Sequence, residues 1–80
     1  MLRIVVSENE LIDWINSKLK TEDACIGCVV KGVIRLRDSN IDDCNWSSSV
    51  FLRCSENDSI RCRSLANTII AEAQSLFNIQ

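Results

Sequence analysis

Residues 28–37 alternate between two kinds of position. The even positions are small or apolar: Cys28, Val30, Gly32, Ile34 and Leu36. The odd positions are two valines and three cations: Val29, Lys31, Val33, Arg35 and Arg37. This period of two predicts a β-strand with one buried face and one face toward water. Because the outward face mixes valines with cations, it favours an interacting surface over a purely solvated one.

Two other segments have helical periodicity. Ser7 and Glu10 form a capping box at the start of a helix that is expected to run to about Lys20. Its apolar stripe consists of Leu11, Ile12, Ile15 and Leu19. A second helix is expected from Ser59 to about Phe77, with its stripe at Cys62, Ala66, Ile69, Ala73 and Leu76. A competing interpretation makes residues 59–63 a strand, but the unbroken stripe favours the helix.

These elements predict an α+β fold of order (β)αββα in a single domain, residues 1–80. Residues 2–6 alternate weakly and predict a short optional strand, and residues 50–54 predict a strand with Phe51 and Arg53 outward. Two amphipathic helices would then pack on one face of a small, mainly antiparallel sheet. Because a two-stranded sheet is marginal in water, the first strand or a second subunit is expected to complete it.

Composition and charge are those of an ordinary globular protein, with 46% hydrophobic residues and a net charge of −2. The slightly acidic balance argues against a dedicated duplex-DNA binder. The apolar run over residues 1–6 is followed at once by Ser7 and Glu8 and is too short for a signal peptide, and no stretch approaches the ~20 apolar residues of a membrane span. A cytoplasmic protein without membrane contact is therefore expected.

The chain has five cysteines and no histidine. Without a secretion signal, the odd number favours reduced thiols over a disulfide framework. Cys25 and Cys28 form a CxxC, but no second CxxC follows, and the remaining cysteines are singly spaced. A turn cysteine followed by a core cysteine is therefore preferred over half of a zinc site or a redox pair, and neither a metal nor a cofactor is expected.

Catalytic chemistry finds little support. The absence of histidine removes the commonest general base, and two glycines leave no phosphate-binding loop. Residues 38–42 place oxygen ligands at alternate positions as a calcium loop does. However, Asp43 stands where such a loop has glycine, and Ser49 stands where it has a bidentate glutamate. No catalytic residue is expected, and the protein is not expected to be an enzyme.

The candidate binding face is the outward side of the two expected strands: Val29, Lys31, Val33, Arg35, Arg37, Phe51 and Arg53. It suits a protein partner or a second copy of the chain. Alternatively, Phe51 stacks under a base while the cations follow a single-stranded nucleic acid. A third interpretation is a solvated face on which the Lys and Arg stems cover the valines.

A polar loop adds a second candidate region: Asp42, Asp43, Asn45 and Trp46. Trp46 either folds back over the end of the core or anchors a partner. The sequence thus predicts a non-catalytic binding module for protein–protein interaction or self-association, most simply a homodimer. The alternative function is a weak single-stranded nucleic-acid binder.

Overall fold

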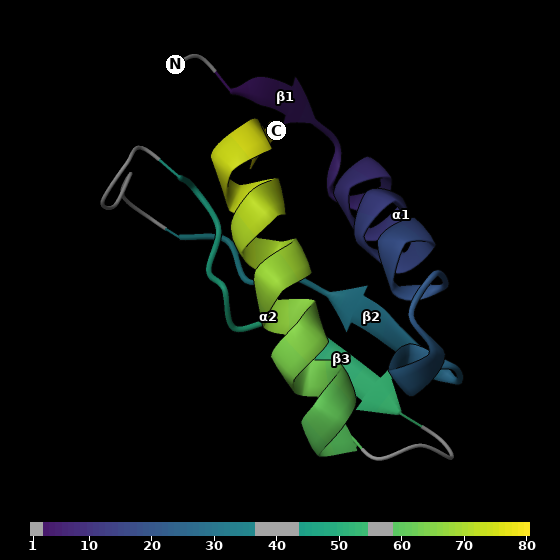
Figure 1. Cartoon of the computed structure of the whole chain (residues 1–80). Helices are drawn as coiled ribbons and strands as arrows, with labels where there is room; N and C mark the ends of the chain where they lie inside the picture. The colour runs from purple at the N-terminus through teal and green to yellow at the C-terminus, as the bar shows by residue number, and fades with distance from the viewer. Residues whose placement is uncertain (1–2, 37–43, 55–58) are drawn as a thin grey trace.

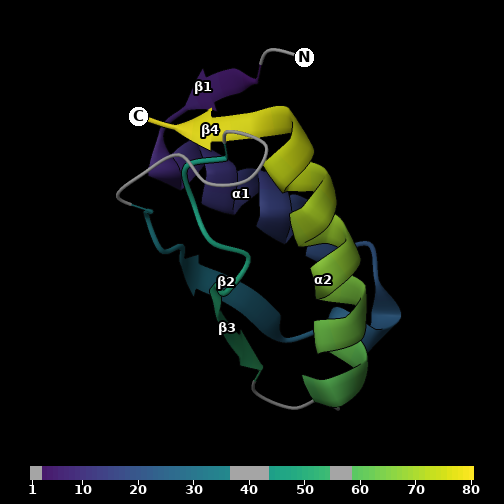
Figure 2. The same cartoon turned by 90° about the vertical axis from the view of Figure 1, so that its left-hand side faces the viewer.

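The computed structural model describes residues 3–36, 44–54 and 59–80. These residues form an elongated body of 35 × 19 × 17 Å (Figure 1). Its elements in chain order are β1 (Ile4–Val6), α1 (Glu8–Leu19), the 3₁₀ turn η1 (Asp23–Cys25), β2 (Cys28–Gly32), β3 (Phe51–Cys54), α2 (Ser59–Leu76) and β4 (Phe77–Ile79). Figure 2 shows β1 and β4 at one end of the long axis and β2 and β3 toward the other, with α2 running between the ends.

The expectation of one mainly antiparallel sheet is wrong. There are two separate two-stranded sheets among the described residues, a parallel β1–β4 pair and an antiparallel β2–β3 pair. The missing element was β4, which continues directly from α2 and pairs with β1 in the register Ile4↔Phe77 to Val6↔Ile79. Three residues at the end of a helical stripe are too few to show a period of two. The coarser description, a small α+β arrangement, still applies.

The strand predicted over residues 28–37 is shorter than expected, and its phase is reversed at Val33 and Ile34. The register of β2 against β3 shifts between Val30 and Gly32. A one-residue shift moves every following side chain to the opposite face. Val33 is therefore buried at 8% exposure, whereas Ile34 is 40% exposed, so the prediction that Val33 points outward is wrong.

Both helices agree with their sequence patterns. The Ser7 hydroxyl accepts from the Glu10 amide, and the Glu10 carboxylate accepts from the Ser7 amide, both at 3.1 Å, which confirms the capping box. Three positions of the expected stripe of α1 have no exposure, namely Leu11, Ile15 and Leu19. Residues 59–63 belong to α2, which confirms the helix over the competing strand.

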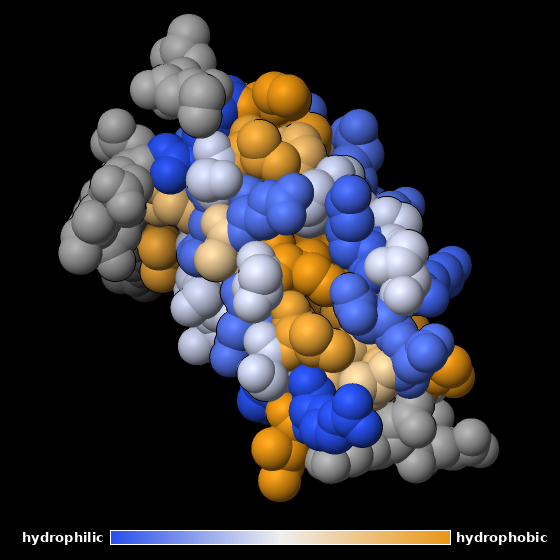
Figure 3. Space-filling model, viewed as in Figure 1, coloured by the Kyte–Doolittle hydropathy of each residue, from blue (hydrophilic) through white to orange (hydrophobic). Residues whose placement is uncertain are grey.

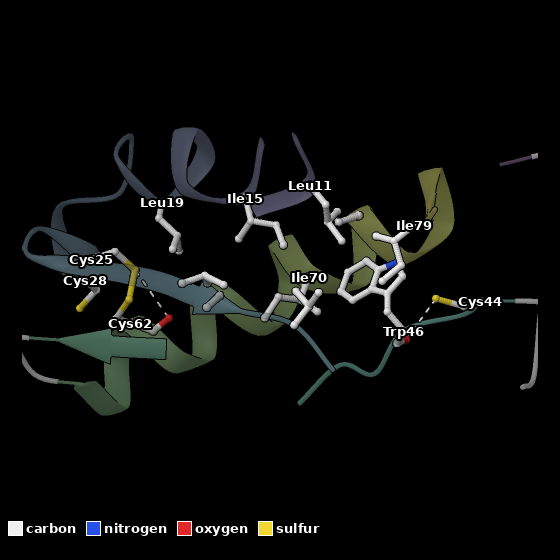
Figure 4. Close-up of a cluster of buried hydrophobic side chains, with 14 residues drawn as sticks. Leu11, Ile15, Leu19, Cys25, Cys28, Cys44, Trp46, Cys62, Ile70 and Ile79 are labelled. Atoms are coloured by element: carbon white, nitrogen blue, oxygen red, sulfur yellow. Dashed lines mark hydrogen bonds between the residues drawn. A yellow bond between two sulfur atoms is a disulfide. The ribbon is translucent and has the colours of Figure 1, made fainter. Parts of the chain in front are cut away.

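One continuous core runs between the two ends of the molecule. Leu11, Ile15 and Leu19 project from α1 into it, and Ile70 of α2 lies opposite them (Figure 4). Toward one end of this core lie Cys25, Cys28 and Cys62, and toward the other lie the ring of Trp46 and the sulfur of Cys44. No helix in the described part of the chain is long and apolar enough to cross a membrane.

Candidate functional site

The cysteines overturn the expectation of reduced thiols. Cys25 is bonded to Cys62, and Cys28 is bonded to Cys54, with Cα–Cα distances of 4.8 and 3.9 Å. Only Cys44 is a free thiol, and it is buried. The odd cysteine count gave no indication of this arrangement, because four of the five pair and the fifth lies at the other end of the core (Figure 4).

The two disulfides lie close together. The sulfurs of Cys28, Cys54 and Cys62 all lie within 4.8 Å of one another, and the sulfur of Cys25 is bonded to that of Cys62. Four elements bring them there, because η1 ends at Cys25, β2 begins at Cys28, β3 ends at Cys54 and α2 carries Cys62 in its first turns. We call these four residues the cysteine cluster.

The turn between the first two cysteines explains how they reach the same place. Gly27 has a φ of 83°, in the left-handed region that L side chains adopt only with strain. It lies directly after Ile26, which is 60% exposed. The chain thus reverses between Cys25 and Cys28, and both of these side chains point inward, at 2% and 5% exposure.

Trp46 lies at the opposite end of the core and has no exposed surface. Its indole Nε1 donates to the carbonyl oxygen of Phe77 at 3.0 Å, and Gln74 Nε2 donates to the carbonyl oxygen of Trp46 at 3.1 Å. These bonds tie residue 46 to the end of α2 and to β4. Trp46 therefore covers the end of the core, and it lacks the exposure on which the alternative, an anchor for a partner, depends.

Two asparagine side chains close strand edges. The Asn16 carboxamide accepts from the Val30 amide at 2.7 Å and donates to the Val30 carbonyl at 3.2 Å. The Asn45 carboxamide accepts from the Ile79 amide at 2.9 Å and donates to the Ile79 carbonyl at 2.7 Å. Each carboxamide satisfies the two backbone groups that a neighbouring strand would have satisfied. The free edges of β2 and β4 are thus capped from within the chain.

The expected binding face is brought together only in part. Val29 pairs with Arg53 and Gly32 pairs with Phe51 across β2 and β3. Lys31, Phe51 and Arg53 are exposed, Phe51 at 59%, and Val29 is half-buried. Arg35 lies beyond the bulge, where it pairs with Trp46 and its guanidinium donates to the carbonyl oxygen of Gln80. Arg37, Asp42 and Asp43 lie outside the described residues.

The sequence held one signal for the cysteine cluster that spacing alone does not reveal. Cys28 and Cys54 stand on the inward phase of the two expected strands, and antiparallel pairing places the start of one strand opposite the end of the other. The observed register pairs them directly. No family model, curated protein or solved structure matches the chain.

Proposed function

We propose that this chain is a non-catalytic binding module that associates with a second copy of itself through the outer edge of β3. The observation that carries the proposal is the unequal treatment of the strand edges. Asparagine carboxamides cap β2 and β4, whereas no strand in the described part of the chain pairs with the outer edge of β3. An open edge is a template for pairing with another chain.

The hydrogen-bond alternation of an antiparallel ladder identifies which groups this edge offers. Val30 directs its N–H and C=O away from β3, toward Asn16, so Val30 and Leu52 form a pair that does not hydrogen-bond across the ladder. Leu52 therefore directs its own N–H and C=O to the outer edge. These two groups are available to an added strand.

A symmetric contact also suits the side chains of this edge. If two copies pair antiparallel about Leu52, each Phe51 lies opposite Arg53 of the second copy. An arginine facing an aromatic ring is favourable, whereas a register centred on Arg53 would oppose two like charges. The contact would join two two-stranded sheets into one of four strands, which is more stable in water.

The same exposed residues support nucleic-acid binding less well. A stacking platform for single strands uses several aromatic rings, and the described outer face has Phe51 alone. Val33 is buried and Arg35 is engaged with Gln80, so Lys31 and Arg53 are the cations left on this face among the described residues. Protein contact is therefore the function that we propose.

The test compares the outer edges of β1 and β3, with which no other strand of the described residues pairs. On the side seen in Figure 3, apolar side chains gather over β1 and again near the start of α2. Val5 on β1 is 60% exposed and Phe51 on β3 is 59% exposed, so Phe51→Asp and Val5→Asp introduce the same charge at equal exposure. Light scattering after gel filtration at micromolar concentration is expected to give twice the chain mass for wild type and Val5→Asp, and one chain mass for Phe51→Asp.

A wild-type monomer throughout that range would overturn the proposal, as would dissociation by Val5→Asp instead of Phe51→Asp. Binding of a single-stranded oligonucleotide by the monomer, lost in Arg53→Ala, would support the alternative function.

The proposed location is the cytoplasm. Fractionation of host cells against compartment markers tests it, and recovery from an oxidising compartment, where disulfides normally persist, would contradict it.

A further inference from the structure

We propose that the cysteine cluster is a zinc site when both of its disulfides are reduced. Its ligands would be the thiolates of Cys25, Cys28, Cys54 and Cys62. Neither the interaction edge nor the sequence pattern assigns such a site. The inference rests on the closeness of three sulfurs, those of Cys28, Cys54 and Cys62, and on the bond that joins the Cys25 sulfur to one of them.

Three of the sulfurs lie nearly as close together as the sulfurs of a metal site. In a tetrahedral Zn²⁺ site, Zn–S distances of about 2.3 Å place the sulfurs about 3.8 Å apart. The sulfurs of Cys28, Cys54 and Cys62 already lie within 4.8 Å of one another, although Cys28 and Cys62 belong to different disulfides. Two disulfides that only staple the chain need not share one location, whereas coordination of a single ion requires it.

The local backbone also suits zinc. Cys25 and Cys28 have the CxxC spacing that supplies two ligands from one turn, and Gly27 allows that turn to close. Cys54 at the end of β3 and Cys62 in α2 supply the other two ligands from separate elements. Structural zinc sites commonly join short elements in this way, because a small domain has too little core to hold them.

Burial and charge are compatible with a closed site. Cys25, Cys28 and Cys62 are at most 5% exposed, and Cys54 is half-buried, so an ion among them would be largely shielded from water. A zinc tetrathiolate has a net charge of −2. Arg61 and Arg63 flank Cys62 in the sequence of α2, and their exposed side chains add two positive charges to this end of the molecule.

The chemistry balances with a dithiol as reductant. Each disulfide takes up two electrons and two protons and becomes two thiols, while one dithiol molecule becomes a cyclic disulfide. The four thiols then release four protons to solvent as they bind one Zn²⁺. In the reverse direction two cyclic disulfide molecules take four electrons from the four thiolates and four protons from solvent, which releases the ion and restores the two disulfides. The cluster thus holds either two disulfides or one metal ion.

The experiment uses the full chain, reduced with dithiothreitol and desalted without oxygen. Titration with Co²⁺ is expected to give one ion per chain, with the charge-transfer and visible bands of a tetrahedral tetrathiolate, and Zn²⁺ should displace it. Cys54→Ser removes one ligand and should lower zinc affinity by more than the about 10–100-fold that loss of an outer hydrogen-bonding partner causes. Cys44→Ser is the matched control, because Cys44 lies at the other end of the core (Figure 4), and it should bind as wild type does.

A second measurement needs no variant. Reduced wild-type protein is alkylated with and without Zn²⁺, and the modified residues are identified by mass spectrometry. Zinc is expected to slow alkylation of Cys25, Cys28, Cys54 and Cys62. The zinc-treated protein should hold one ion per chain. Equal alkylation of these four residues with and without zinc would overturn the proposal. Failure of the reduced chain to bind stoichiometric metal, or equal zinc affinity in Cys54→Ser and wild type, would also overturn it.

Discussion

The two ends of this molecule solve the same problem with different chemistry. Each end has a two-stranded sheet, which is marginal in water without further support. At the β1–β4 end, residues 45 and 46 supply that support through hydrogen bonds to Phe77 and Ile79 and through the buried indole of Trp46. At the β2–β3 end, two covalent bonds join η1, β2, β3 and α2.

This difference means that the two ends should respond to different perturbations. The Trp46 end depends on shape and on unbroken hydrogen bonds, neither of which a reductant alters directly. The cysteine end depends on the oxidation state of four sulfurs. A chain of 80 residues has a thin core, so either support is a large part of its stability.

Removal of the Trp46 side chain is expected to have the largest effect. Trp46→Ala should lower the free energy of unfolding by about 3–5 kcal/mol, because it leaves a cavity at a site with no exposed surface. Denaturant titration in non-reducing buffer measures the change. Trp46→Phe is the control, since it keeps a ring but loses the donor to Phe77, and it should cost less. An unchanged midpoint for Trp46→Ala would show that the covalent end alone holds the fold.

Removal of one disulfide comes next. Cys28→Ser/Cys54→Ser and Cys25→Ser/Cys62→Ser should each cost about 2–4 kcal/mol, because cross-linking restricts the unfolded chain. The sequence separations of 26 and 37 residues are similar enough that the two losses should be close.

Hydrogen exchange on the same variants sharpens the comparison. Amides of β2 and β3 should lose protection before those of β1 and β4, because the removed disulfides lie at the β2–β3 sheet. A uniform loss of protection across both sheets would contradict the division of the molecule into two separately supported ends.

How much of this the sequence could predict differs between the elements. The two helices were predictable because capping chemistry and a stripe of apolar residues are local signals, as Ser7, Glu10 and Leu11 illustrate. The parallel β1–β4 pair was not predictable, because it joins residues at opposite ends of the chain and β4 spans three residues. The reversed phase at Val33 depends on a register shift between β2 and β3, and no residue type in the sequence predicts that shift.

The candidate sites show the same limit. Lys31, Phe51 and Arg53 were placed correctly on an exposed face because strand alternation is local. The cysteine cluster was missed because its members are separated by loops, and spacing in sequence gives no distance in space. The capping roles of Asn16 and Asn45 also depend on long-range contacts, and asparagine in a helix or a polar loop gives no specific signal for them.

The two asparagine caps allow a direct comparison of the ends with one type of substitution. Asn45→Ala leaves the N–H and C=O of Ile79 without their hydrogen-bond partner, and Asn16→Ala does the same to those of Val30. Both residues are buried, Ile79 at 3% and Val30 at 2% exposure. Leaving such groups unpaired costs about 1–3 kcal/mol. Melting temperatures under non-reducing conditions should therefore fall in both variants. We expect the larger fall for Asn45→Ala, since the cysteine end keeps its disulfides. A larger fall for Asn16→Ala would reverse the ranking of the two ends.

The smallest effect should come from Gly27→Ala, and it tests whether the turn contributes to the cysteine end beyond its covalent bonds. With a φ of 83°, an alanine at this position is expected to cost about 1–2 kcal/mol. Gly32→Ala is the matched control on the neighbouring strand, because its added Cβ would meet the Phe51 ring at 3.3 Å, and that exposed ring is able to move. If the disulfides alone stabilise the cysteine end, both variants should have the melting temperature of the wild type. If the left-handed turn is needed to bring Cys25 and Cys28 to one point, Gly27→Ala should melt at a lower temperature than Gly32→Ala. It should also be reduced faster by dithiothreitol, because a strained turn opens the cluster more often.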